Sequence, residues 1–321
     1  MTTGVIKIIF WVVSALVLIG LVIWFLTGTV FGAWSGNWFS GINIGGFESL
    51  TEPFSSQSVK TADPSNIHSL NINWVAGEIT VIPHDGDEII VTEYAQRQLR
   101  DAERFRISTD GGTLTIRFRE NNNRIRNMPR KNLEVLVPRE LSDDLNRLVI
   151  NTTSGKVNVE NFEASSLNIS AVSAAVGVTN IVSQNIDINT TSGAVTASSA
   201  RAGKLEISSV SGAANVFDSN VTTLNISTTS GRTNVSGEFD RVDVSTVSGS
   251  TTIRSTTTPS RMSVSSVSGA TDVYIPNTGE ITVSHSAVSG KFTSAVPVIM
   301  QSNAAYSFSS VSGNTNIHLI G

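Results

Sequence analysis

The chain has 321 residues, of which 40% are hydrophobic and 15% charged, and its formal net charge is −4. This composition excludes a disordered chain, which would combine low hydrophobicity with high net charge, and it argues against a general nucleic-acid-binding protein, which normally carries a basic excess. The absence of cysteine excludes disulfides, a thiolate nucleophile and cysteine-type zinc sites.

Residues 8–26 are apolar except for Ser14 and Gly20. A helix of this length spans about 28 Å and can cross a membrane, whereas the apolar core of a cleaved signal peptide has only about 7 to 15 residues. Lys7 precedes the helix, and the next Lys or Arg is Lys60. The positive-inside rule therefore predicts a single-pass cell-membrane protein, with residues 1–7 in the cytoplasm and the C-terminal domain outside.

Residues 27–65 are rich in glycine before Phe47, contain Pro53 and Pro64, and show no sustained period of 2 or 3.6. We interpret them as a flexible juxtamembrane stalk.

A Ser-Gly pair then recurs through the chain, and Ser173-Ala174 takes one of its places. Successive Ser positions are 19, 19, 19, 19, 18, 20, 21 and 23 residues apart. Such a period is typical of stacked repeats. The glycines, which we predict to form sharp corners with positive φ, are Gly155, Gly193, Gly212, Gly231, Gly249, Gly269, Gly290 and Gly313. Replacing Gly212 by Val should therefore cost about 1 kcal/mol or more.

Apolar residues lie six and four positions before each of the first seven Ser residues and five after it, as Leu205, Ile207 and Val216 do around Ser211. Polar residues alternate with them, which indicates strands with one buried face. Two strands and a corner in 19 residues leave room for one more side. We therefore predict an all-β, single-domain, right-handed parallel β-solenoid over residues 66–321; a β-sandwich is the alternative.

The first third of this domain, residues 66–150, holds 25 of its charged residues, against 18 in residues 151–321. The solenoid template still fits it twice, with corners at Ala76-Gly77 and Gly111-Gly112. We therefore predict charged, irregular first coils over 66–150 and regular Ser-Gly coils over 151–321.

Catalytic chemistry has little support in the sequence. A polysaccharide-cleaving enzyme needs two carboxyl groups a few Å apart, but the acidic residues of the regular repeats are scattered singly. The four histidines are far apart, at positions 68, 84, 285 and 318. We predict neither catalytic residues, nor a metal, nor a cofactor.

A basic segment stands out between Arg97 and Lys131, where ten basic residues face four acidic ones. One interpretation is a solvated loop rich in ion pairs. The other is a contact for an anionic wall polymer or lipid head groups, because arginine binds phosphate in a bidentate way. The candidate contact residues are Arg117, Arg119, Arg124, Arg126, Arg130 and Lys131.

The anchor, the stalk and repeats such as residues 205–216 together resemble the bacterial putative-adhesin family of unknown function, the toastrack-like β-strand-repeat envelope proteins. The resemblance covers residues 66–321. It implies a right-handed solenoid at the cell surface, a link to envelope stress and a scaffolding role, and it supplies no catalytic residue.

Three functions follow in order of preference: a non-enzymatic binding scaffold at the cell envelope, a surface adhesin, and a polysaccharide-active enzyme. The stalk reaches roughly 34 Å and a dozen coils add on the order of 60 Å, which is short for crossing a thick wall. This favours the scaffold, with an envelope protein or anionic polymer as its partner.

The chain ends at Gly321, directly after an apolar strand at residues 317–320. An uncovered solenoid end exposes unpaired strand groups. We therefore expect self-association or partner binding through an edge that contains Ile317, unless the large side chains of Tyr306 and Phe308 close it.

Overall fold

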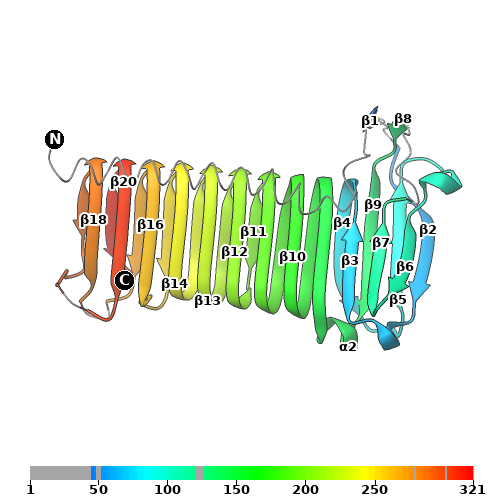
Figure 1. The fold of residues 1–321 in the computed structure, drawn as a ribbon, viewed down its shortest axis with the longest axis horizontal. Coiled ribbons are helices and arrows are strands. Elements are labelled where there is room, and N and C mark those ends of the chain that lie inside the picture. The colour runs from blue at the N-terminus through cyan, green and yellow to red at the C-terminus, as the bar shows by residue number, and fades with distance from the viewer. Residues whose placement is uncertain (1–44, 48–51, 120–125, 278–279, 301, 321) are drawn as a thin grey trace. The chain divides into compact units, whose positions relative to one another are not determined.

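The computed structural model describes residues 45–47, 52–119, 126–277, 280–300 and 302–320 (Figure 1). Its described residues form two compact units, one up to Asp187 and one from Ile188, and the boundary falls inside strand β10. The predicted anchor, residues 8–26, lies outside the described residues. Within the described residues, no helix has the length and apolarity needed to cross a membrane.

The described part of the first unit contains nine complete strands, the first part of β10 and three short helical turns. The strands are β1 (Gly45–Phe47), β2 (Ser55–Ala62), β3 (Ser69–Asn73), β4 (Ala76–His84), β5 (Ile89–Ala95), β6 (Arg106–Asp110), β7 (Thr113–Arg117), β8 (Arg126–Met128), β9 (Lys131–Pro138) and β10 (Leu145–Ser192). The helical turns are η2 (Pro64–Asn66), η3 (Asp101–Glu103) and α2 (Arg139–Ser142).

The described part of the second unit contains the end of β10 and eleven further strands. They are β11 (Val195–Ser198), β12 (Arg201–Ser211), β13 (Ala214–Ser230), β14 (Thr233–Ser248), β15 (Thr251–Ser255), β16 (Arg261–Ser268), β17 (Thr271–Ile275), β18 (Thr282–Ser289), β19 (Phe292–Ser294), β20 (Ala305–Ser312) and β21 (Thr315–Leu319). The all-β class is thus confirmed.

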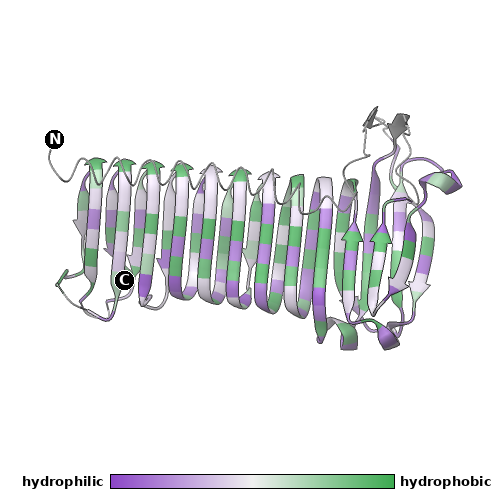
Figure 2. Cartoon of the chain, viewed as in Figure 1, coloured by the Kyte–Doolittle hydropathy of each residue, from purple (hydrophilic) through white to green (hydrophobic). Residues whose placement is uncertain are grey.

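Strands of the second unit stack in parallel, with equivalent repeat positions side by side. Leu205 of β12 pairs with Leu224 of β13, and Leu224 pairs with Val242 of β14. Burial alternates along each strand, and Figure 2 shows the matching alternation of hydrophobic and hydrophilic residues. The parallel register follows the predicted columns, while the right-handed sense of the coils stays a prediction.

Every predicted corner glycine has a positive φ, between 124° at Gly155 and 158° at Gly212 and Gly231. The stacking of the coils makes a second demand on these positions. A Cβ atom on Gly249 would lie 1.9 Å from the backbone oxygen of Gly231 in the neighbouring coil. The corner therefore requires glycine for close approach of two backbones as well as for its φ angle.

A second corner, which was not predicted from the sequence, lies seven residues after each of the first five Ser residues, from Ser154 to Ser230. The residues with positive φ there are Asn161, Asn180, Ser199, Asp218 and Gly237. Asn and Asp adopt this conformation more readily than most residues because their short side chains bond locally. Recurrence of such residues at this spacing was the available sequence signal.

The first unit follows the solenoid template at one of its two predicted matches and departs from it at the other. The first template match is in register, because Leu70 pairs with Leu148 and Gly77 with Gly155. The second is wrong: β6 and β7 form an antiparallel hairpin, and Leu114 pairs with Leu70 rather than following a solenoid corner. Antiparallel pairs β2–β5 and β5–β9 complete this unit.

The predicted stalk is also too long. Strand β2 lies within residues 27–65 and pairs with β5 over most of its length. Thus the first unit begins upstream of residue 66, and residues 55–62 are part of its sheet rather than of a flexible linker.

The last strands do not follow chain order. β20 lies between β16 and β18, and β21 lies between β17 and β19. The C-terminal strands therefore lie between earlier strands, and the outermost coil is formed by β18 and β19, of which Figure 1 labels β18 at the end of the row. The expected open edge at Ile317 is wrong, because Ile317 is buried and its strand is paired on both sides.

Candidate binding surfaces

The basic segment is divided between solvent and core. Arg117 and Arg130 are exposed, and Arg119 is half-buried, with burial lowering the pKa of its guanidinium. The side chains of Arg124 and Arg126 lie outside the described residues. For the exposed arginines, contact with an anionic polymer or lipid stays a prediction.

Lys131 corrects the predicted contact set because its side chain is fully buried. Its Nζ atom donates to Oε1 of Glu93 at 2.6 Å and to the backbone oxygens of Glu103 and Phe118 at 2.6 and 2.5 Å. The ammonium also lies 3.9 Å from the ring centroid of Phe118 and 5.0 Å from that of Trp74. Lys131 is therefore a core residue that a polymer in solvent does not reach.

Burial works against the charges of this pair in both partners. Burial raises the pKa of the Glu93 carboxyl, and the adjacent Lys131 ammonium offsets part of this rise. Burial also lowers the pKa of Lys131 to about 8, and the Glu93 carboxylate offsets part of that fall. The Glu93 carboxylate also accepts the backbone N–H of Phe105 at 3.1 Å. This pair thus ties β5 to β9 and to the segment around η3.

Several other charges of the basic segment neutralise one another. Glu103 is only 3% exposed and accepts hydrogen bonds from the Arg97 and Arg100 side chains at 2.7 to 2.9 Å. These bonds, from Arg97 above all, hold the pKa of Glu103 well below its usual range. The ion-pair interpretation of the segment therefore describes this part of it.

We expect Glu103→Gln to lower the free energy of unfolding by roughly 2 kcal/mol at pH 7, because it removes a buried anion from two guanidinium partners. Since the folded-state pKa is lowered, this stabilisation is present above the unfolded pKa of about 4.3 and is lost as the pH falls below it. Urea unfolding followed by circular dichroism at pH 7 and pH 3 measures the difference. Asp101→Asn, on the same turn but 92% exposed, is the control and should change little. A pH-independent difference for Glu103→Gln would contradict the role of its charge.

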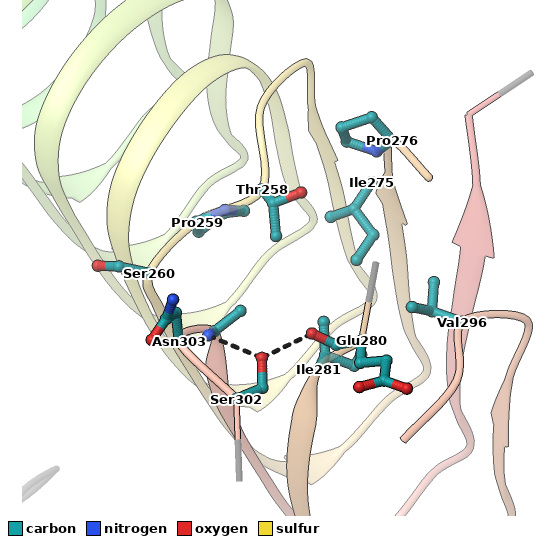
Figure 3. A pocket seen from close by; sticks show the side chains of 11 residues that line it. Thr258, Pro259, Ser260, Ile275, Pro276, Glu280, Ile281, Val296, Ser302 and Asn303 are labelled. Atoms are coloured by element: carbon teal, nitrogen blue, oxygen red, sulfur yellow. Dashed lines mark hydrogen bonds between the residues drawn. The ribbon is translucent and has the colours of Figure 1, made fainter. Parts of the chain in front are cut away.

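The second unit has a cavity of 320 Å³ near its last coils (Figure 3). Its walls come from the connections between β15 and β16, β17 and β18, and β19 and β20. Apolar lining residues are Pro259, Ile275, Pro276, Ile281, Val296 and Ala304, and polar ones are Thr258, Ser260, Glu280, Ser302 and Asn303.

Ser302 shapes one side of this cavity: its hydroxyl donates to the backbone oxygen of Glu280 at 2.6 Å and accepts the N–H of Ala304 at 3.2 Å. The volume lies at the low end of small-molecule pockets, about 300 to 1,000 Å³. Among the described residues that line the cavity, Glu280 is the single carboxylate. This lining can hold apolar and hydroxyl groups, but it offers no carboxylate pair for acid–base catalysis. The cavity was not predicted from the sequence, where the longer repeat spacings of 20, 21 and 23 residues were its signal.

The outer faces of the second unit carry side chains of one kind in rows along the stack. The clearest is the serine column, three positions before each Ser-Gly corner from Ser211 onward, whose members pair in the order Ser208, Ser227, Ser245, Ser265, Ser309 and Ser286. They are exposed or half-buried, and Ser309 donates to Ser265 at 3.0 Å. The column is a regular, uncharged hydroxyl surface.

A second outer row contains three planar side chains from successive coils. The Arg254 guanidinium lies 3.9 Å from the Tyr274 ring centroid, and the Tyr274 and His318 rings stack at 4.6 Å. His318 also lies 3.4 Å from the Asp272 carboxylate. Within the described residues, no group of three or more His, Asp or Glu side chains is placed to hold a metal ion.

Solved structures of similar fold cover most of the chain. A "putative adhesin" from Parabacteroides distasonis has 12% identity and a TM-score of 0.53, with 84% of this chain and 98% of that chain covered. One from Parabacteroides merdae has 12% identity and a TM-score of 0.51, with coverage of 82% and 96%. A "putative lipid binding protein" from P. distasonis has 13% identity, a TM-score of 0.50 and the same coverage of 82% and 96%.

No curated protein matches the chain. The family model described as Toastrack DUF4097 matches residues 67–319, which is most of the chain and both of its compact units. The expected toastrack-like resemblance is thereby confirmed, and the chain belongs to the Toastrack DUF4097 family.

Proposed function

We propose that the chain is a non-enzymatic binding scaffold of the cell envelope: a right-handed β-solenoid held outside the membrane by the helix predicted at residues 8–26. The envelope-stress link implied by the family resemblance belongs to the same proposal. The observation that carries it is the serine column, an uncharged array whose members repeat in strict register from coil to coil. Such an array can bind a partner through many small polar contacts.

Two further observations support a binding role. Structures of similar fold carry the descriptions "putative adhesin" and "putative lipid binding protein", both of which name binding proteins. The cavity lining, with its single carboxylate, suits a bound group better than a reaction. A surface adhesin is the second candidate, and the test below separates it from the scaffold.

The absence of cysteine from the chain allows a direct test. Ser245→Cys places one thiol at an exposed position of the serine column, with little expected effect on folding. In intact cells a membrane-impermeant maleimide should label this thiol, because the domain lies outside. A benzophenone maleimide at the same thiol should then crosslink the chain to a component of its own envelope, detected by a shift in gel mobility.

Thr3→Cys, before the predicted helix, is the topology control and should be labelled only after the membrane is permeabilised. Asp110→Cys, exposed on the β6–β7 hairpin, is the control for contact and should give less adduct. Labelling of the Thr3→Cys variant but not of Ser245→Cys in intact cells would overturn the orientation. Adducts only with added external surfaces would favour the adhesin, and equal adducts from Asp110→Cys would remove the serine column as the binding face.

A further inference from the structure

Strands β18 and β19 of the outermost coil pair with other strands of the second unit on one side only. β18 pairs with β20 and β19 pairs with β21, and among the described residues the contact recorded on the other side is a parallel bridge between Ile281, directly before β18, and Val298. Figure 1 shows β18 beside β20 at the end of the row of strands. The outward N–H and C=O groups of Ile281 bond to Pro297 and Ile299, whereas those of β18 beyond it face no strand among the described residues and are available for pairing with another strand.

Strand β18 lacks the protection that the edge strands of the first unit have. β2, which pairs only with β5 among the described residues, contains Lys60 and a register shift between Ser56 and Ser58. β6, which pairs only with β7 there, contains Arg106 and Asp110. β18 has neither a charge, nor a proline, nor a register shift. Charges and bulges are the usual means of preventing edge-to-edge association, so β18 is suited to pair.

The core is also incomplete at this coil. Tyr306 and Phe308 of β20 are each 2% exposed, whereas their partners Val283 and His285 of β18 are only half-buried. The His285 ring stacks on Phe292 at 5.1 Å, and Phe292 is likewise half-buried. One more covering layer would bury these side chains.

The unpaired strand edges of the chain indicate which partner could pair with β18. A head-to-tail stack would need a second open edge made of parallel strands, but β3 is paired with β10 and β7, and β4 with β10 and β9. The free edges of the first unit are the charged strands described above. β18 has no charge that would select a charged partner, so an identical uncharged edge is the complementary surface.

We propose that two copies of the chain associate through the β18–β19 coil, with β18 antiparallel to β18 of the second copy. A two-fold axis perpendicular to the sheet keeps the inward rows of both copies on the same side and makes the contact isologous. With the axis at His285, Val283 lies opposite Ala287 of the partner subunit. The half-buried core side chains of each copy are then covered by those of the other.

Light scattering on the purified full-length chain in detergent tests this pairing. Ser286 is exposed on β18, so Ser286→Lys should leave the fold intact and place like charges across the two-fold axis. The wild-type chain should contain two copies per particle, and Ser286→Lys one. Ser245→Lys makes the same change in the same serine column on β14, which is paired on both sides, and should retain two copies.

Crosslinking in native membranes locates the contact. A short bismaleimide should join two copies of Ser286→Cys and give far less product with Ser245→Cys. A wild-type chain with one copy per particle would overturn the proposal. So would an unchanged two-copy particle for Ser286→Lys, or equal crosslinking at both positions, because association would then run through another part of the chain such as the predicted helix.

Discussion

Gly249→Ala should lower the free energy of unfolding by about 3 kcal/mol or more, since strain in φ and overlap with a neighbour each cost on the order of 1 to 3 kcal/mol. Gly249 has a φ of 146°, and an added Cβ would lie 1.9 Å from the backbone oxygen of Gly231. The backbone of Gly231 is held in place by hydrogen bonds between the coils, since its N–H donates to the backbone oxygen of Ser248 at 3.1 Å. The backbone therefore cannot move away without losing hydrogen bonds.

Gly111→Ala is the matched control for this effect. Gly111 also has a positive φ, 52°, but a Cβ there would meet nothing within 4 Å. Its substitution should cost about 1 kcal/mol, from backbone conformation alone. Urea unfolding followed by circular dichroism compares the two variants. Equal losses would show that the corner needs glycine only for its φ angle.

The repeat columns were predictable because each coil has to bury apolar residues at strand spacing and to turn at a corner. Leu224 and Ile226 recur at strand spacing, and every repeat needs a corner at the same place. From the sequence, the corner glycine was attributed to φ alone, with an expected cost of about 1 kcal/mol or more for Gly212→Val. The larger demand comes from contact between coils, which a single repeat does not reveal.

The order of the last coils was not predictable from the columns. Residues 305–312 fit the same template as β16 and β18, so the pattern permits either a place between them or a place at the end. The lengths of the connections before and after β18 did indicate the order. The Ser-to-Ser spacing rises to 21 and 23 around β18, and a chain that skips one place in the stack and returns needs those extra residues.

The burial of Lys131 was visible in strand parity, although the surrounding basic residues concealed it. Lys131 is in phase with Leu133, Val135 and Val137, the inward residues of β9. Glu93 is likewise in phase with Val91 on β5. A Lys and a Glu at inward positions of two strands indicate a buried ion pair, but only the observed pairing of β5 with β9 brings them together.

Removing one partner of this pair should have the largest effect in the first unit. Lys131→Met leaves the Glu93 carboxylate buried without its cation, and it leaves the backbone oxygens of Glu103 and Phe118 without their donor. Breaking a buried ion pair in this way costs about 3 to 5 kcal/mol, because the remaining charge is neither solvated nor paired. Urea unfolding of the full chain at pH 7 should therefore show a lower midpoint for Lys131→Met.

The double variant Lys131→Met with Glu93→Leu should recover part of this loss, since it replaces both charges by apolar groups of similar volume. Recovery stays incomplete because the N–H of Phe105 loses its acceptor on Glu93. The exposed pair Lys204–Glu206, at 2.5 Å in the second unit, is the control; Lys204→Met should change stability by less than about 1 kcal/mol. A double variant less stable than Lys131→Met would contradict this explanation. It would show that the unpaired Glu93 carboxylate is not the cause of the stability lost in Lys131→Met.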